Sequence, residues 1–550
     1  MTKERSRWIA LVFISAAISL VIIDGTIVNT IFPSVIKALN LDSTEVQWVQ
    51  ESYVLVFAAL LLVWGSIADR FGRKRLLLIG IAIFVAASVW AGLSEDASSM
   101  ILARVLQGFG GSMVLPTTLS LVNASFQGKE RGIAFAVWGA TIGGMVAVGP
   151  VLGGWLATDF GADGWRLAFN INLPLGLIVM AGLWWWAKES KQEQRVPGVD
   201  VVGALLSVVM FATLVFGLIE GRVYGWWDAS TKNQFELGGL AWPTDGLSII
   251  PVSLAISAVG FVLFVLWERS RAKANKAVLL DLDLFKVGSF RNGSIAALII
   301  SMGEFGILFA IPLWLQNVLL LTPIESGVVL LWLAGGAFLA SGVTGGLSGK
   351  VSPKVLVQGG VALELVGAVG IALFANTEAG MWSIAPFLFV YGIGVGMATA
   401  QLTGVIMVDV PMDKIGQASG SQSTVRQVGS ALGIAVLGTM LFTGVQSSLE
   451  TRIANQVTDE VQSAKIVELV VDSAGGVIPG LTDLLQSPAT GAPLSPDVAK
   501  QITEDAGQAF TDGAKSSAWA AAAFLLLGLI STFNIGSAKA KTPAKTGSKE

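Results

Sequence analysis

Fourteen long apolar stretches run through the sequence, and they restrict the chain to folds that lie within a lipid bilayer. A helix needs roughly 20 mainly apolar residues to cross the hydrocarbon core. Charged residues make up 13% of the 550 positions, against about 25% in a typical soluble protein. We therefore predict an all-α polytopic membrane protein. The fourteen predicted spans are residues 8–32, 46–68, 76–94, 99–122, 131–157, 165–187, 199–219, 248–267, 292–318, 326–347, 355–374, 382–408, 415–443 and 517–536.

The basic residues predict how these helices are oriented. An even number of spans places both termini on one side, and Lys and Arg are enriched in cytoplasmic loops. The loops on the side of the N-terminus hold Lys3, Arg5, Arg7, Arg70, Arg73, Lys74, Arg75, Lys129, Arg131, Lys188, Lys191, Arg195, Arg269, Arg271, Lys273, Lys276, Lys286, Arg291, Lys350, Lys354, Lys414, Lys539, Lys541, Lys545 and Lys549. The opposite side clearly holds only Lys37, Arg222, Lys232, Arg452, Lys465, Lys500 and Lys515. Both termini are therefore predicted to be cytoplasmic, and the first span is too long for the core of a cleavable signal peptide.

The sequence also repeats itself at an offset of 280 residues. The shift places Asp24 on Glu304. It also aligns a basic loop and a glycine pattern: Gly65, Arg70 and Lys74 with Gly345, Lys350 and Lys354, and Gly149, Leu152 and Gly153 with Gly429, Leu432 and Gly433. The repeat predicts a 6 + 2 + 6 arrangement, with six-helix bundles at 1–190 and 286–550 and two inserted helices with an external loop at 191–285. Transporters built from repeats bind substrate where the halves meet.

Two segments of the second half lie outside the predicted spans. Residues 444–516 are external and carry an excess of acidic residues. Their scattered apolar residues leave two alternatives open, a small folded hairpin or a solvated spacer. Residues 537–550 form a short polar cytoplasmic tail, which we expect to be unstructured.

The loop between the second and third spans carries the strongest motif. It reads from Gly65 to Arg75 and contains Asp69, Arg70, Gly72 and Arg73. A glycine lets a neighbouring helix approach closely, and an aspartate can accept hydrogen bonds from arginines or from the start of a helix. We predict a cytoplasmic gate here, although the cations by themselves would also serve to fix topology. The loop resembles the signature loop of the major facilitator superfamily, which implies the major facilitator fold.

The fourth span has a polar face within the membrane. Arg104, Gln107, Gly108 and Gly111 recur at helical spacing, and they resemble the arginine-containing motif that the superfamily associates with proton transfer. An arginine within a bilayer is costly and should face a partner inside the bundle. Asp24 is the expected partner, whereas an arginine that reaches the headgroups is the alternative.

Further motifs indicate export. Gly149, Pro150, Gly153 and Gly154 in the fifth span resemble the superfamily's exporter motif, with Met145 where that motif usually has another glycine. The first span from Asp24 to Pro33 and the stretches 165–176, 315–327 and 416–429 are similar to the branch of fourteen-helix drug:proton antiporters, which includes quaternary-ammonium exporters. The resemblance covers residues 8–439.

Four of the predicted spans carry an acidic residue away from their ends. These residues are Asp24, Glu51, Glu304 and Glu364. The chain contains no histidine, so proton transfer near neutral pH must use carboxyl groups, whose protonated form is favoured by burial away from water. A carboxylate that binds either a proton or a cation couples the two fluxes.

The candidate residues fall into two groups. We assign Asp24, Arg104 and Glu304 to proton coupling. We assign Glu51, Glu364, Asn29, Phe305 and Trp314 to the substrate cavity. Glu51 near the outer end of its span could instead be merely hydrated, and the two aromatic residues could be packing residues.

These features together predict a multidrug efflux transporter that contributes to antibiotic resistance. It would exchange lipophilic, often cationic, drugs and dyes for protons in the plasma membrane of a prokaryote, with the proton gradient in place of a cofactor. Export of an endogenous lipid, cell-wall precursor or secondary metabolite is the alternative, and a non-transporting receptor is a third. We expect no enzymatic site, metal or nucleic-acid partner, and we expect the chain to act as a monomer.

Overall fold

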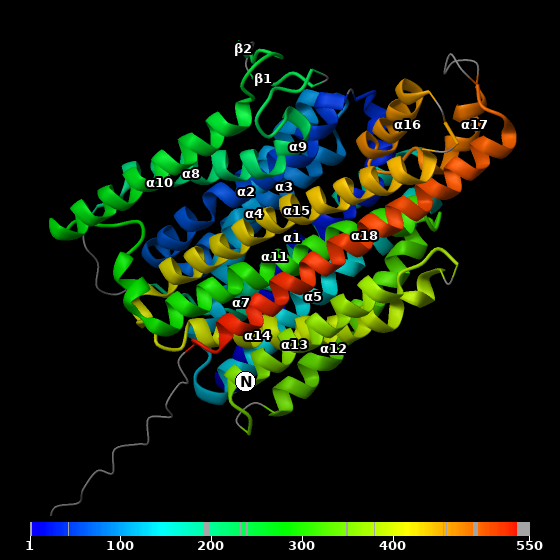
Figure 1. Ribbon diagram of the computed structural model, residues 1–550. Coiled ribbons are helices and arrows are strands. Elements are labelled where there is room, and N and C mark those ends of the chain that lie inside the picture. Colours follow the sequence, from blue (N-terminus) through cyan, green and yellow to red (C-terminus); the bar gives the residue numbers. More distant parts are fainter. Residues whose placement is uncertain are drawn as a thin grey trace, which may run out of the picture.

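The computed structural model is a bundle of long helices that run roughly parallel to one axis (Figure 1). It describes residues 3–41, 43–191, 198–231, 233–237, 240–347, 350–378, 380–454, 456–457, 459–487 and 493–535. The predicted cytoplasmic tail 537–550 lies outside these residues. The start of α1 and the end of α18 lie at one end of the bundle, and α16 and α17 lie at the other (Figure 1).

The helices follow the predicted apolar stretches closely. They are α1 (Lys3–Leu39), α2 (Ser43–Phe71), α3 (Arg73–Gly92), α4 (Ala97–Ser125), α5 (Gly128–Asp159), α6 (Gly164–Asn170), α7 (Asn172–Trp186), α8 (Val201–Ile219), α9 (Gly221–Tyr224), α10 (Ile249–Lys273), α11 (Gly288–Asn317), α12 (Pro323–Leu347), α13 (Pro353–Phe374), α14 (Ala385–Ile406), α15 (Ile415–Ile453), α16 (Glu460–Asp472), α17 (Leu481–Gln486) and α18 (Pro496–Thr532). Two short strands, β1 (Glu236–Leu237) and β2 (Leu240–Ala241), pair in the external loop after α9.

Thirteen segments of the described chain are helical, long enough and apolar enough to cross a membrane. In a fourteenth helix, α12, the apolar run is the shorter segment Ile324–Ala340. One predicted span, 165–187, is formed by α6 and α7 in succession. The all-α membrane fold is therefore confirmed, and the helices are compatible with fourteen crossings.

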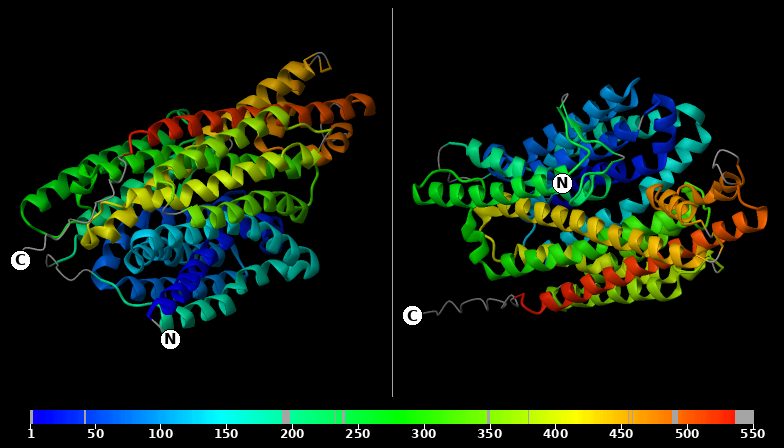
Figure 2. Two further views of the ribbon diagram at one scale, coloured as in Figure 1. Left: turned by 90° about the horizontal axis from the view of Figure 1, so that it is seen from below. Right: turned by 45° about the horizontal axis from the view of Figure 1, so that its top comes forward.

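Helices from the start and the end of the chain form two groups. In the left view of Figure 2 the blue to cyan helices gather on one side and the yellow to red helices on the other. The groups meet where α2 packs on α15 and α5 packs on α12, and the inserted α8 packs on α10, α2 and α15. Division of the chain at residues 190 and 285 stays a prediction.

Repeat-related glycines make equivalent contacts in the two groups. A Cβ on Gly80 would lie 2.9 Å from the carbonyl oxygen of Gly110, where α3 meets α4. A Cβ on Gly360, 280 positions later, would lie 2.8 Å from the carbonyl oxygen of Gly394, where α13 meets α14. Small residues allow this close approach of helix backbones in a bilayer, so the repeat is visible in the packing.

The external segment 444–516 is largely helical. Helix α15 continues to Ile453, and α18 begins at Pro496, well before the predicted span at 517. Its apolar residues are buried as part of the main hydrophobic core, to which Ile466, Val467, Val470, Leu481, Leu485 and Phe510 belong. The folded alternative therefore describes this segment better than the solvated spacer, although extensions of two membrane helices form much of it.

Candidate functional site

A cavity of about 640 Å³ lies between the two groups of helices. Its lining residues come from the external halves of α1, α2, α4, α8, α11 and α15, from α9, and from the segments that follow α9 and α16. They include Gly25, Val28, Glu51, Tyr53, Val54, Arg104, Leu218, Ile219, Arg222, Val223, Trp226, Phe309, Leu313, Ile434, Ala435, Gly438, Thr439, Phe442 and Ala474. With the orientation that the basic residues predict, the cavity belongs to the external half of the protein.

The cytoplasmic ends of the same helices are in contact. The carboxylate of Asp69, at the end of α2, accepts hydrogen bonds from the backbone N–H groups of Gly416 (2.9 Å) and Gln417 (3.1 Å) at the start of α15. An anion at a helix N-terminus is favourable because the first N–H groups have no partner within the helix. A Cβ on Gly65 would lie 2.6 Å from the carbonyl oxygen of Gly416 and 2.7 Å from the Cα of Gly420. The motif thus joins α2 to α15 at the end of these helices that lies away from the cavity.

The arginines of the motif have partners on the cytoplasmic side. Arg73 forms a buried ion pair with Asp69 (Nη2 to Oδ1, 2.7 Å) and donates to the Ser190 hydroxyl at 2.6 Å. Arg70 donates to the carbonyl oxygen of Gly198. These contacts connect the predicted gate loop to the segment that precedes α8.

Gly72 has the backbone angle φ of +110°, which L side chains rarely adopt. A Cβ there would also meet the carboxylate of Glu189 at 2.7 Å. That carboxylate accepts the N–H groups of Lys74 and Arg75, both at 3.1 Å, and so caps the start of α3. The glycine is required by both its conformation and its neighbour.

The structure brings Asp24 and Arg104 together. Asp24 is 0% exposed and Arg104 2% exposed, and the Arg104 Nη1 donates to Asp24 Oδ2 at 2.9 Å. The other carboxylate oxygen accepts from the amides of Gln107 (2.7 Å) and Asn172 (3.0 Å). A buried carboxylate is tolerated when it is paired and hydrogen-bonded in this way.

Arg104 connects this pair to the cavity. Its side chain lines the cavity, its Nε donates to the carbonyl oxygen of Val49 at 3.3 Å, and its guanidinium lies 4.3 Å from the centre of the Tyr53 ring. Because the pair spans α1 and α4 while Arg104 also contacts α2, a change in the charge of Asp24 would alter contacts among three helices.

Glu304 occupies the corresponding position in the second group of helices. It forms an ion pair with Arg426 of α15 (3.3 Å) and accepts from the Thr399 hydroxyl of α14 (3.2 Å). Glu304 and Phe305 line a separate cavity of about 40 Å³ together with Tyr391 and Arg426.

Glu364 is fully buried within the same group of helices. It is close enough to Glu304 for the two carboxyl groups to interact electrostatically. Neither of its oxygens has a hydrogen-bonding partner among the described residues. Glu364 is therefore buried within the second group of helices, and it is not among the residues that line the large cavity.

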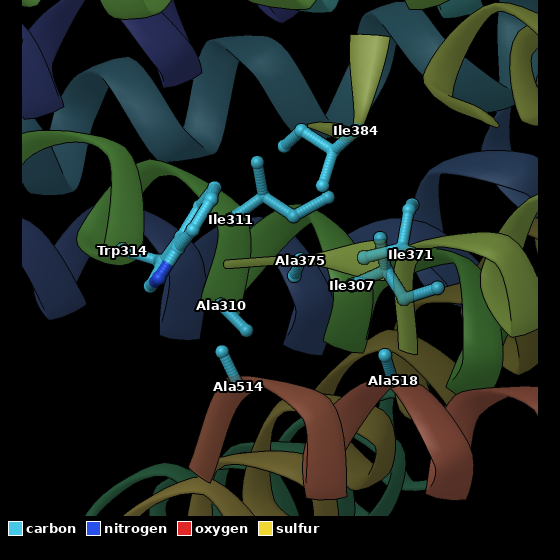
Figure 3. A pocket seen from close by; sticks show the side chains of 9 residues that line it. All are labelled: Ile307, Ala310, Ile311, Trp314, Ile371, Ala375, Ile384, Ala514 and Ala518. Atoms are coloured by element: carbon cyan, nitrogen blue, oxygen red, sulfur yellow. The ribbon is translucent and has the colours of Figure 1, made fainter. Parts of the chain in front are cut away.

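Trp314 and Asn29 were also predicted to line the substrate cavity. Trp314 is 2% exposed and donates its indole N–H to the Thr511 hydroxyl at 2.9 Å. It borders a small apolar cavity between α11, α13 and α18 (Figure 3), separate from the large cavity. Asn29 lies in α1, but its side chain is outside the described part of the structure.

The glycines of the predicted exporter motif lie where α5 meets two other helices. A Cβ on Gly149 would lie 1.9 Å from Thr26 Oγ1 of α1, and a Cβ on Gly153 2.9 Å from the Ile27 side chain. Gly154 faces the other way, where its Cβ would lie 2.5 Å from Ile324 of α12. With Pro150 inside the helix, the motif lets α5 pack between the two groups.

Substitution of Gly149 by Ala is expected to destabilise the protein. The added methyl group would also lie 2.9 Å from the backbone atoms Ile23 O and Ile27 N, which cannot rotate away. Overpacking of this kind costs about 1–3 kcal/mol, which thermal unfolding of the purified protein would detect. Gly25→Ala is the control, because its Cβ would meet nothing within 4 Å. Equal unfolding temperatures for the two variants would contradict this account of the motif.

Several partners in these clusters were not assigned from the sequence. They are Asn172 beside Asp24, Glu189 at the gate, Arg426 beside Glu304, and Glu220 beside Glu51. Asn172 and Arg426 lie within the family-like stretches 165–176 and 416–429. No comparable signal marked Glu189 or Glu220. Among the described residues, no group of three or more acidic side chains is placed to hold a metal ion.

Comparison with known proteins agrees with this architecture. Residues 14–434 match the family described as the Major Facilitator Superfamily. The chain is 30% identical over 483 residues to the "Multidrug resistance protein Stp" of Mycobacterium tuberculosis, covering 86% of this chain and 84% of Stp. It is 32% identical over 444 residues to a "Probable actinorhodin transporter" of Streptomyces coelicolor, covering 79% and 72%. The crystal structure of the human organic anion transporter MFSD10 shares the fold, with a TM-score of 0.59 at 10% identity over 96% of this chain and 99% of that chain.

Proposed function

The chain belongs to the Major Facilitator Superfamily, and from this premise we propose that it exports lipophilic, often cationic, small molecules in exchange for protons. Asp24, Arg104 and Glu304 are the residues that we assign to proton coupling. Because both relatives come from bacteria, we place the protein in the plasma membrane of a prokaryote.

The buried Asp24–Arg104 pair carries the proposal. It lies at the wall of a cavity in the external half, while Asp69 and α15 close the cytoplasmic side. A proton that arrives from outside and binds Asp24 would neutralise the carboxylate and weaken its hold on Arg104. Because Arg104 also contacts α2, this weakening favours rearrangement of the helices toward the inward-open state, where the proton can leave.

Substrate moves in the opposite direction in this cycle. It enters the inward-open cavity from the cytoplasm or the inner leaflet, and it leaves when the outward-open state binds protons. Rocking of the two helix groups about a central site is a known mode of transport for repeat-built transporters. The cavity volume of about 640 Å³ lies within the range of about 300–1,000 Å³ that is typical of drug-sized ligands.

Export of one endogenous compound is the second candidate. The relative described as a probable actinorhodin transporter is named for one compound, whereas Stp is named for multidrug resistance. The acidic residue Glu51 and the aromatic residues Trp226 and Phe309 on the cavity wall favour cationic and aromatic substrates. We therefore place the multidrug function first.

The proposal is tested in inverted membrane vesicles with an acidified interior. Addition of ethidium should trigger loss of protons from the vesicle interior while dye accumulates there, and vesicles without the protein should show neither change. If folded, inserted protein gives no proton release with ethidium or other cationic dyes, the multidrug proposal is overturned. The search for substrates would then turn to lipids and metabolites.

A further inference from the structure

Two acidic residues from distant parts of the chain meet beside the large cavity. Glu51 lies in the external part of α2 and lines the cavity. Glu220 directly follows α8 and therefore belongs to the inserted segment between the two groups of helices. Their carboxyl groups are within hydrogen-bonding reach of one another. Glu220 is 2% exposed, and one oxygen of each residue, Oε2, has no partner in the described part of the chain.

Two acidic side chains in contact do not stabilise the fold, but they can bind a positive charge. Two carboxylates in contact and away from water cannot both be ionised at low cost, so they share a proton and together hold one negative charge. Burial raises the pKa of Glu220 above its ordinary value, and burial together with both acids raises that of the nearby Tyr224. The two unpartnered oxygens are buried acceptors that no described residue uses.

The basic residues nearby are engaged elsewhere. The guanidinium of Arg222 lies 3.6 Å from the centre of the Phe442 ring and donates to the carbonyl oxygen of Val471 at 3.2 Å. Arg104, which also lines the cavity, is paired with Asp24. Within the described residues neither arginine forms an ion pair with Glu51 or Glu220, so the negative charge of the pair is not neutralised by the protein.

Asp24 cannot serve the same purpose in this state. Its two oxygens accept hydrogen bonds from Arg104, Gln107 and Asn172, and its side chain is fully buried. Arg104 lines the cavity and Asp24 does not, so a positively charged ligand there would meet a positive charge. The exposed part of Glu51 and the aromatic side chains of Trp226 and Phe309 instead line the cavity.

We propose that Glu51 and Glu220 form a cation-binding site at the external end of the cavity, to which the inserted segment supplies one of the two acids. The site holds a monocation when the pair retains one proton, and a dication when the pair has lost both. In the outward-open state protons from outside, one for a bound monocation and two for a bound dication, bind the free carboxylates, the pair becomes neutral, and the cation leaves to the outside. Only O–H bonds form or break in this step. The inference rests on the proposed export of cationic substrates and identifies where their charge is bound.

The site predicts a difference between two dyes that share a ring system but differ in charge. Equilibrium binding of ethidium, a monocation, and propidium, a dication, would be measured by fluorescence with the purified full-length protein at pH 8. In Glu220→Gln the affinity for propidium should fall about tenfold or more, because only one negative charge remains. Ethidium affinity should change less than about threefold, and the Glu51→Gln/Glu220→Gln double variant should lose affinity for both dyes.

The matched control is Asp245→Asn, which removes an exposed acid from the same external loop of the inserted segment. It should bind both dyes as the wild type does. Propidium binding that is unchanged in both Glu220→Gln and Glu51→Gln overturns the inference, and either single variant suffices if the other does not fold. If wild-type protein exchanges ethidium for protons in vesicles while these variants bind propidium normally, the inference fails and the proposed function stands. If the wild type binds neither dye, the proposed substrate class fails and the inference with it.

Discussion

Replacement of Asp24 by Asn should abolish dye-driven proton exchange and leave a protein that still reaches the membrane. We expect the rate of ethidium-triggered proton release to fall by roughly 100-fold or more, the scale on which a positioned proton-transfer group acts. Asn has nearly the same shape as Asp and can still accept a hydrogen bond from Arg104. It cannot bind and release a proton, so the coupled step is lost.

The same substitution has a cost in stability that must be separated from its effect on transport. Arg104 would remain buried without its counter-charge, and loss of one partner of a buried pair costs about 3–5 kcal/mol. The double variant Asp24→Asn/Arg104→Gln removes both charges and should recover much of this stability, because no uncompensated charge stays buried. Proton exchange should remain absent in the double variant.

A second readout distinguishes lost coupling from lost transport. Exchange of labelled for unlabelled dye across the membrane, with no proton gradient, does not require net proton movement. Asp24→Asn should retain part of this dye exchange, whereas a misfolded protein would retain none. Proton release at the wild-type rate in Asp24→Asn would show that coupling lies elsewhere, and the Glu304–Arg426 pair would be the next candidate.

The sequence predicted the membrane helices well because each depends on a local property. A run of apolar residues must be helical in a bilayer, where every backbone N–H and C=O needs a partner within its own segment. The external half of α18 was not predicted because it is not a continuous apolar run. From Pro496 to about residue 516 this helix is polar on its exposed side and buries Ile502 and Phe510 against the external segment, which a search for apolar runs does not detect.

The contact between Asp24 and Arg104 was predictable, whereas other contacts were not. A charged residue inside a bilayer requires a partner, and the two residues lie at similar depth on helices of the same half. Arg426 satisfies the same need for Glu304, but the sequence alone did not show toward which neighbour its face of α15 points.

The sequence did not predict the pairing of Glu51 with Glu220. The inserted segment has no counterpart in the internal repeat, so the offset of 280 residues provides no position for α8 relative to α2. Glu220 also lies just outside an apolar run, where an acidic residue is ordinarily read as hydrated. Only the packing of α8 against α2 and α15 brings it beside Glu51.

Replacement of Asp69 by Ala should shift the protein from the outward-open toward the inward-open state. The substitution removes the acceptor of the Gly416 and Gln417 N–H groups and leaves Arg73 without its buried partner. Contacts of this kind are worth about 3–5 kcal/mol when one partner is lost, and each 1.4 kcal/mol changes the ratio of two states about tenfold. The closed cytoplasmic side is the state that loses these contacts, so the inward-open population should grow.

The natural absence of cysteine from the chain makes this shift measurable with single Cys substitutions and a membrane-impermeant maleimide. Ser419→Cys reports on the cytoplasmic side, since Ser419 of α15 is 0% exposed near Gly420 and α2. Thr439→Cys reports on the external cavity, which Thr439 lines. Asp69→Ala should raise the labelling rate of the Ser419→Cys variant and lower that of the Thr439→Cys variant, each by roughly tenfold or more.

Asp413→Ala is the matched control for this experiment. Asp413 lies just before α15 and is exposed, so its loss removes one negative charge near the same helix start without breaking the contact to α2. Labelling in Asp413→Ala should match that of the parent variants. If Asp69→Ala also leaves both labelling rates unchanged, the hydrogen bonds of Asp69 do not hold the cytoplasmic side closed. The Gly65–Gly420 backbone contact would then have to provide that closure, and Gly65→Val would be the variant that opens it.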